Sequence, residues 1–134
     1  MIHRPLRYAL IAFYAYGTFV HIANMASLTG FDWPSAPVKW QVLDVVYLIL
    51  DLVVVVGLLF RQRLGVTAVI LAATSQILLY TLLRSWVLDV PQEILPSPEQ
   101  QNYLNILVGF HAISISLVLA SLAWWRFQST ERPS

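Results

Sequence analysis

Two carboxylic acids, Asp44 and Asp51, interrupt the apolar stretch LDVVYLILDLVVVVGLLF, which runs from Leu43 to Phe60. On a helix this spacing places them on one face, about 10 Å apart along the axis. A charge at the centre of a membrane helix costs roughly 2.5 to 3.5 kcal/mol on insertion scales, so an acid there is expected to be paired or functional. Two such acids can transfer protons or orient the polar end of an apolar molecule.

Other apolar stretches carry polar side chains at matching depths. Counted at about 1.5 Å per residue, His21, Gln76 and His111 reach the level of Asp51, about 10 to 18 Å below one surface. Nearer that surface lie Asn24, Asp44, Arg84 and Asn105. The opposite half of the apolar region is nearly pure Leu, Val, Ala and Phe. We therefore expect a polar cavity in the outer half, with these ligand-binding residues: Asp51, His21, Gln76, Asp44, Asn24, Arg84 and His111.

Each of these residues also has a structural interpretation. Asp44 lies near the expected start of a helix, where the helix dipole favours an acid. Asp51 lies too deep for that explanation, and its structural role would be an ion pair or a hydrogen bond to Arg84, His21 or Gln76. Both alternatives remain open at this stage.

The composition is that of an integral membrane protein. The chain has 134 residues, of which 58% are hydrophobic and 11% charged, against roughly 25% charged residues in a soluble domain. Its mean hydropathy is +0.68. Because there is no cysteine, disulfides, thiolate metal sites and iron–sulfur clusters are excluded. The net charge of +1 and the lack of a basic run predict no nucleic-acid partner.

The sequence predicts an all-α, polytopic membrane protein built as one four-helix domain over residues 1–134. A span needs about 20 apolar residues, and such stretches fall at about 8–28, 41–60, 64–88 and 103–125. The spans are separated by segments whose residues are typical of turns: FDWPSAP, RQR and DVPQEILPSPEQQ.

The arginines predict the orientation of these four spans. Six of them fall on one side: Arg4, Arg7, Arg61, Arg63, Arg126 and Arg132. Only Lys39 and the membrane-edge Arg84 fall on the other. Because positive loops stay in the cytoplasm, both termini are expected there, in a multi-pass protein of the cell membrane, such as a bacterial inner membrane.

The fourth expected span carries a ridge of small or short side chains at helical spacing. The ridge consists of Asn105, Gly109, Ala112, Ser116 and Ala120. Small residues let membrane helices approach closely, so the ridge is expected to face a neighbouring helix. His111 lies roughly opposite it.

The run VLDVVYLILDLVVVVGLLFRQRLGVTAVILAATSQILLYTLL is followed by a proline-containing loop and by NYLNILVGF. This order of parts resembles the DoxX and DoxX-like family of small four-helix membrane proteins, which share an acid in span two, a G-L-L ending, a basic turn and a polar start of span four. The resemblance implies an accessory component of a larger membrane complex, since members are associated with sulfur and quinone redox systems.

Four functions remain open, of which transport is the least favoured because the sequence shows no inverted repeats or broken helices. The leading hypothesis is a binder of a lipophilic molecule, a quinone or an isoprenoid, oriented by Asp51, His21 and Gln76. A weaker resemblance to the EXPERA group of sterol isomerases, on His21, Asp44 and Asp51, implies instead an enzyme that moves a proton on a lipid. The third is a b-type haem held by His21 and His111. No metal-ligand motif is present, and neither the cofactor nor the reaction follows from the sequence.

Overall fold

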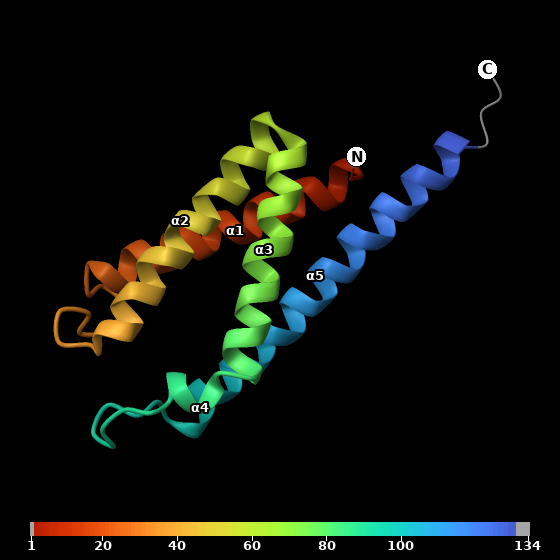
Figure 1. Ribbon diagram of the computed structural model, residues 1–134. Helices are drawn as coiled ribbons and strands as arrows, with labels where there is room; N and C mark the ends of the chain where they lie inside the picture. The colour runs from red at the N-terminus through yellow and green to blue at the C-terminus, as the bar shows by residue number, and fades with distance from the viewer. Residues whose placement is uncertain (1, 131–134) are drawn as a thin grey trace.

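The computed structural model describes residues 2–130, and within that range every regular element is a helix (Figure 1). The helices are α1 (Arg4–Met25), α2 (Val38–Phe60), α3 (Gln62–Thr81), α4 (Arg84–Val87) and α5 (Pro98–Thr130). Among the described residues, α2, α3 and α5 are long and apolar enough to cross a membrane. α1 is not one of these three helices. The all-α class is therefore confirmed for the described residues, and the presence of three such helices supports a membrane protein.

The end of α1 is set by backbone hydrogen bonds. After Met25 the chain turns through Ser27, whose φ of 55° lies in the left-handed region. The amide of Leu28 donates to the carbonyl of Ala23 at 2.8 Å, which closes the helix end in the manner of a Schellman motif. The helix therefore ends at Met25, three residues before the predicted limit of 28.

The third helix differs more from its predicted range of 64–88. α3 ends at Thr81, and the separate one-turn helix α4 follows. The side chains of Lys39 and Trp40 at the start of α2 donate to three backbone carbonyls of this segment: Trp86, Val87 and Asp89. In a helix that ended at 88, the carbonyls of Trp86 and Val87 would be among the last four, which have no partner within the helix, and these bonds satisfy them. Hydropathy alone does not report such contacts.

The start of α5 lies five residues before the predicted limit of 103, because a capping box precedes it. The Ser97 hydroxyl accepts from the Gln100 amide at 3.3 Å, and the Gln100 side chain accepts from the Ser97 amide at 2.8 Å. Pro98 occupies the first helical position, where its missing N–H removes no intrahelical bond.

The helices pack in chain order around the bundle. α2 packs on both α1 and α3, α3 packs on α5, and only a light contact between α1 and α5 closes the ring. Figure 1 accordingly shows α3 between α2 and α5. The apolar core joins all four long helices through Leu10, Tyr14, Val54, Leu58, Val69, Ala72 and Val118.

The turn between α2 and α3 is unusually tight, since Arg61 alone separates them. Gly57 and Gly65 meet across this turn. A Cβ atom on Gly57 would lie 2.7 Å from both the Cα and the N of Gly65, and one on Gly65 would meet the backbone of Gly57 and Leu58. The close approach therefore depends on the missing side chains.

The predicted packing face of the fourth span is wrong. The ridge residues on α5, including Gly109, Ala112 and Ser116, are exposed, and nothing lies within 4 Å of where a Cβ of Gly109 would be. The buried face instead carries His111, Ser114, Val118 and Ser121. Small side chains allow close packing of helices, but they do not determine which face of α5 is buried. The cost of exposing polar side chains to lipid does determine it.

Candidate functional site

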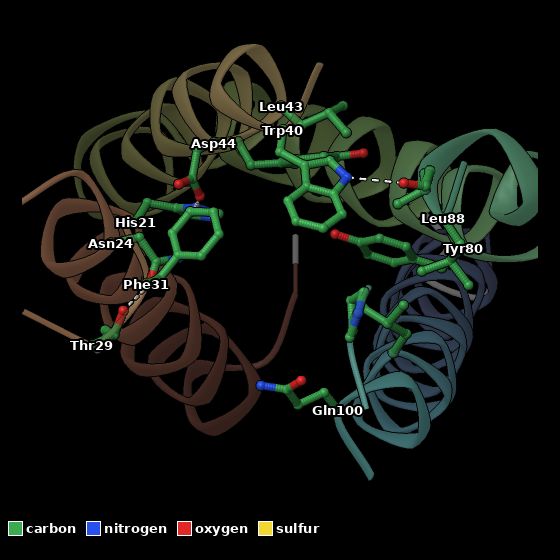
Figure 2. Close-up of a pocket in the computed structure, with 14 residues that line it drawn as sticks. His21, Asn24, Thr29, Phe31, Trp40, Leu43, Asp44, Tyr80, Leu88 and Gln100 are labelled. Carbon is green, nitrogen blue, oxygen red and sulfur yellow. Dashed lines mark hydrogen bonds and ion pairs between the residues drawn. The ribbon is translucent and has the colours of Figure 1, made fainter. Parts of the chain in front are cut away.

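A cavity of about 380 Å³ opens between the ends of the helices at the end of the bundle opposite Arg61. We call it the outer cavity. Figure 2 shows Trp40, Asp44, His21, Tyr80 and Gln100 surrounding it from α2, α1, α3 and α5. Its other walls are largely apolar: Phe31, Leu43, Val87, Leu88, Pro96 and Leu104. The site therefore combines an apolar wall with a few convergent polar groups, as binding sites for small molecules do.

The shortest polar contact in the wall of the outer cavity joins α1 to α2. His21 Nδ1 lies 2.5 Å from Asp44 Oδ1 (Figure 2). Asp44 is only 9% exposed, so its charge is not simply solvated at a helix end. With a proton on Nδ1, the imidazole donates to the carboxylate, which fixes the ring and leaves Nε2 available.

The second nitrogen of His21 faces the deeper acid. His21 Nε2 lies 3.9 Å from Asp51 Oδ2, and Asp51 is 3% exposed. The imidazole thus stands between two carboxylates, one at the cavity and one in the interior. The Tyr47 ring lies nearly parallel to it, with centroids 6.4 Å apart. Such an arrangement can hold a proton on either nitrogen or pass one between the two acids.

Asp51 borders a second, smaller space of about 100 Å³, which we call the inner chamber. Gln76 and His111 also line it. His21 and Tyr80 line both spaces, so these two side chains form the partition between the outer cavity and the inner chamber.

The interior beside the inner chamber contains polar atoms without a protein partner. The Tyr14 hydroxyl and His111 Nε2 are buried and make no hydrogen bond to any described residue. His111 is 1% exposed, and its Nδ1 lies 2.7 Å from the Leu107 carbonyl oxygen, so this nitrogen donates along its own helix. The chamber, which His111 lines, has room for a few water molecules, each of about 30 Å³ in the liquid, and one of them would satisfy His111 Nε2.

The structure places six of the seven predicted site residues at one or both of these spaces. Asn24 and Asp44 line the outer cavity, where Asn24 Oδ1 accepts from Thr29 at 2.8 Å. Asp51, Gln76 and His111 line the inner chamber, and His21 touches both spaces.

Arg84 lines neither space. Its guanidinium donates to Asn105 Oδ1 at 2.5 Å and to the Gln101 carbonyl at 3.2 Å. Of the three partners considered for Asp51, the ion-pair partner is therefore His21.

Sequence reasoning missed several residues of the outer cavity, among them Tyr80, Trp40 and Gln100. Tyr80 follows Gln76 and precedes Arg84 at helical spacing, a signal that could have found it, whereas Trp40 lies just before the expected start of the second span at 41. Gln100 lies in a segment that the sequence marks only as a loop, so no pattern pointed to it.

The geometry gives the haem hypothesis no support. His21 and His111 both border the inner chamber, but its volume of about 100 Å³ is far below the roughly 300 to 1,000 Å³ of cofactor pockets. Both nitrogens of His21 also face carboxylates. Within residues 2–130, no three His, Asp or Glu side chains come together as a possible metal site.

Comparisons with known proteins add no relative to this description. The chain matches no protein-family model, no curated protein and no solved structure.

Proposed function

We propose that this chain is a four-span membrane protein, with both termini in the cytoplasm, that binds one lipophilic molecule in the outer cavity. The observation that supports it best is the His21–Asp44 pair, a partly buried polar contact of 2.5 Å in the wall of a largely apolar space of about 380 Å³. An apolar molecule with one polar end matches both features, because its body removes apolar wall from water while its end meets the pair.

The fourth span in this proposal is α1. It has 22 residues, which as a helix extend about 33 Å, and it packs along α2. Its polar groups His21 and Tyr14 are turned into the bundle rather than outward. A helix whose polar residues are covered by neighbours can lie in a bilayer although its average hydropathy is modest.

The polar groups suit a quinone or an isoprenoid. Tyr80 and Gln100 offer a hydroxyl and an amide to the cavity, and such donors can bind the carbonyl oxygen of a quinone. The Asp44 carboxylate can accept from the hydroxyl of an isoprenoid alcohol. In this proposal the chain is an accessory, DoxX-like component of a larger membrane complex.

A second function is favoured by one specific contact. His21 lies between Asp44 and Asp51, at 2.5 and 3.9 Å. A carboxylate–imidazole–carboxylate series can remove a proton from a bound lipid at the cavity and return one from the interior. The alternative is therefore an EXPERA-like enzyme that transfers protons on a lipid substrate.

The test is to purify the protein in mild detergent and identify the lipids that remain bound by mass spectrometry. We expect a stoichiometric quinone or isoprenoid, reduced in Asp44→Asn and His21→Gln. Asp89→Asn is the control, because Asp89 is an exposed acid that does not line the cavity. An equal loss of bound lipid in all three variants, or the absence of bound lipid in the unsubstituted protein, contradicts the proposal.

The same sample separates the binder from the enzyme. Incubation in heavy water leaves the carbon-bound hydrogens of a merely bound molecule unchanged, whereas proton transfer at carbon incorporates deuterium. Incorporation that depends on His21 selects the enzyme.

A further inference from the structure

Two buried polar side chains that line the inner chamber have no hydrogen-bond partner in the described part of the chain. Asp51 on α2 is 3% exposed, and Gln76 on α3 is 8% exposed. The one ion-pair partner of Asp51 among the described residues is His21, whose Nε2 lies 3.9 Å from Asp51 Oδ2, beyond hydrogen-bond distance. The Tyr14 hydroxyl is sealed among protein atoms, whereas the polar atoms of Asp51 and Gln76 are not. Both side chains therefore present polar atoms to the chamber.

The charged groups around the chamber do not balance. Asp44 and Asp51 are two acids, and the imidazole of His21 between them carries at most one positive charge. Arg84 is turned to α5, where it binds Asn105. His111 lines the chamber but makes no ion pair with any described residue, so a proton there would add a second unpaired charge. At least one negative charge therefore has no cation in the described protein.

A carboxylate without a cation is costly at this depth. Asp51 lies near the middle of α2, which is long and apolar enough to span a membrane. Two charges buried together cost less than one buried alone, provided that polar groups complete the site. An occupant of the chamber with one positive charge would therefore stabilise the folded protein.

The size and the ligands of the chamber favour a metal ion as this occupant. Its volume of about 100 Å³ fits an ion with a few water molecules, each of about 30 Å³ in the liquid. The Asp51 carboxylate and the Gln76 amide oxygen are hard oxygen ligands, which suit cations without soft character. Asp51 is the only acid of the described chain that lines the chamber, so a charge of +1 is balanced and a charge of +2 is not.

We infer that the inner chamber binds one monovalent metal cation, Na⁺ or K⁺, between Asp51 and Gln76, with water as its remaining ligands. When His21 Nδ1 donates to Asp44, the lone pair of Nε2 can accept from one of these waters. His21 and Tyr80 line both spaces, so the cation would enter from the outer cavity between these two side chains. The site is separate from the lipid site proposed above, and it does not require a bound lipid.

The experiment measures thermal unfolding of the full chain in non-ionic detergent. Choline chloride is replaced stepwise by sodium or potassium chloride at constant ionic strength, and choline serves as a cation too large for the chamber. We expect the midpoint to rise with Na⁺ or K⁺ and to saturate. Equal midpoints in the three salts would overturn the inference. Stabilisation by Ca²⁺ alone, or by a lower pH without any response to Na⁺ or K⁺, would also overturn it.

Variants place the response in the inner chamber. Asp51→Asn keeps the shape of the side chain and removes the charge, so we expect it to abolish the response. Gln76→Leu should weaken the apparent affinity roughly five-fold, the loss expected for one neutral polar contact. Asp89→Asn is the control, because Asp89 is an exposed acid that does not line the chamber. An unchanged response in Asp51→Asn, or equal weakening in all three variants, would overturn the inference.

The Gln76→Leu variant also covers the case in which Asp51→Asn does not fold. Leucine is apolar and favours helix, so this variant should fold in detergent, and unchanged cation affinity in it would by itself overturn the inference. Mass spectrometry of the lipid retained by the same variant tests the outer cavity separately, because Gln76 does not line that space. Loss of the cation response with the lipid retained assigns the two ligands to two sites.

Discussion

The Asp51 carboxylate on α2 occupies the position that a Cβ atom would take if Gly17 on α1 carried a side chain. α1 therefore carries a glycine where the acid of α2 approaches it, and Asp51 is held against α1, in reach of His21. The pocket for this acid is created by the absence of a side chain on the neighbouring helix.

Gly17→Ala should displace the Asp51 side chain without unfolding the bundle. The clashing atom is the end of a side chain that can rotate, and alanine favours helix over glycine by about 1 kcal/mol. We expect a small change in the unfolding midpoint but weaker retention of any ligand that depends on Asp51. A double-mutant cycle with Asp51→Ala checks this: the two effects on retention should not add, and additive effects would contradict the contact.

Gly65→Ala should behave differently, because its Cβ would meet backbone atoms of Gly57 and Leu58 that cannot rotate away. We expect a loss of stability of about 1 to 3 kcal/mol or more, as for overpacked cores. Gly109→Ala is the control, since nothing lies within 4 Å of its Cβ position. Thermal unfolding in detergent measures both variants, and equal midpoints would show that the α2–α3 turn is not closely packed.

A series of substitutions at Asp44 should separate hydrogen bonding from charge. Asp44→Asn keeps an oxygen that can accept from His21 Nδ1, so we expect a loss of about 1 kcal/mol in unfolding free energy. Asp44→Ala removes the acceptor and leaves the imidazole unpaired, for which we expect about 1.5 to 3 kcal/mol. Urea or thermal unfolding ranks the two. If alanine is tolerated as well as asparagine, the pair does not hold α1 to α2.

The proposed orientation is tested in intact cells. Tags on both termini should be protected from an impermeant label, because six of the seven arginines fall on one side of the predicted four-span layout. A single cysteine introduced at Asp32 or at Asp89, in the opposite loops, should be labelled. Accessible termini would reverse the assignment.

Much of the site was predictable because burying polar groups in hydrocarbon is costly. Counting residues along each expected span placed His21 at the same depth in the membrane as the acids. In the structure His21 contacts both Asp44 and Asp51. Depth does not determine rotation about the helix axis, so it could not show that Arg84 turns to Asn105 instead. The separate helix α4 was hidden for a similar reason: donors from Lys39 and Trp40 bind its carbonyls from a segment more than 40 residues away.

The connection through Arg61 also bears on how the protein enters its membrane during synthesis. Because a single residue connects α2 and α3, one of these helices cannot leave the translocon while the other remains at a distance from it. The two should integrate as a single hairpin unit. α1 is less apolar than these helices, and its half-buried His21 meets its carboxylate partners on α2. We therefore expect α1, although made first, to integrate last. Nascent chains truncated before α2 should remain extractable by alkali, and integration of such a chain on its own would contradict this order.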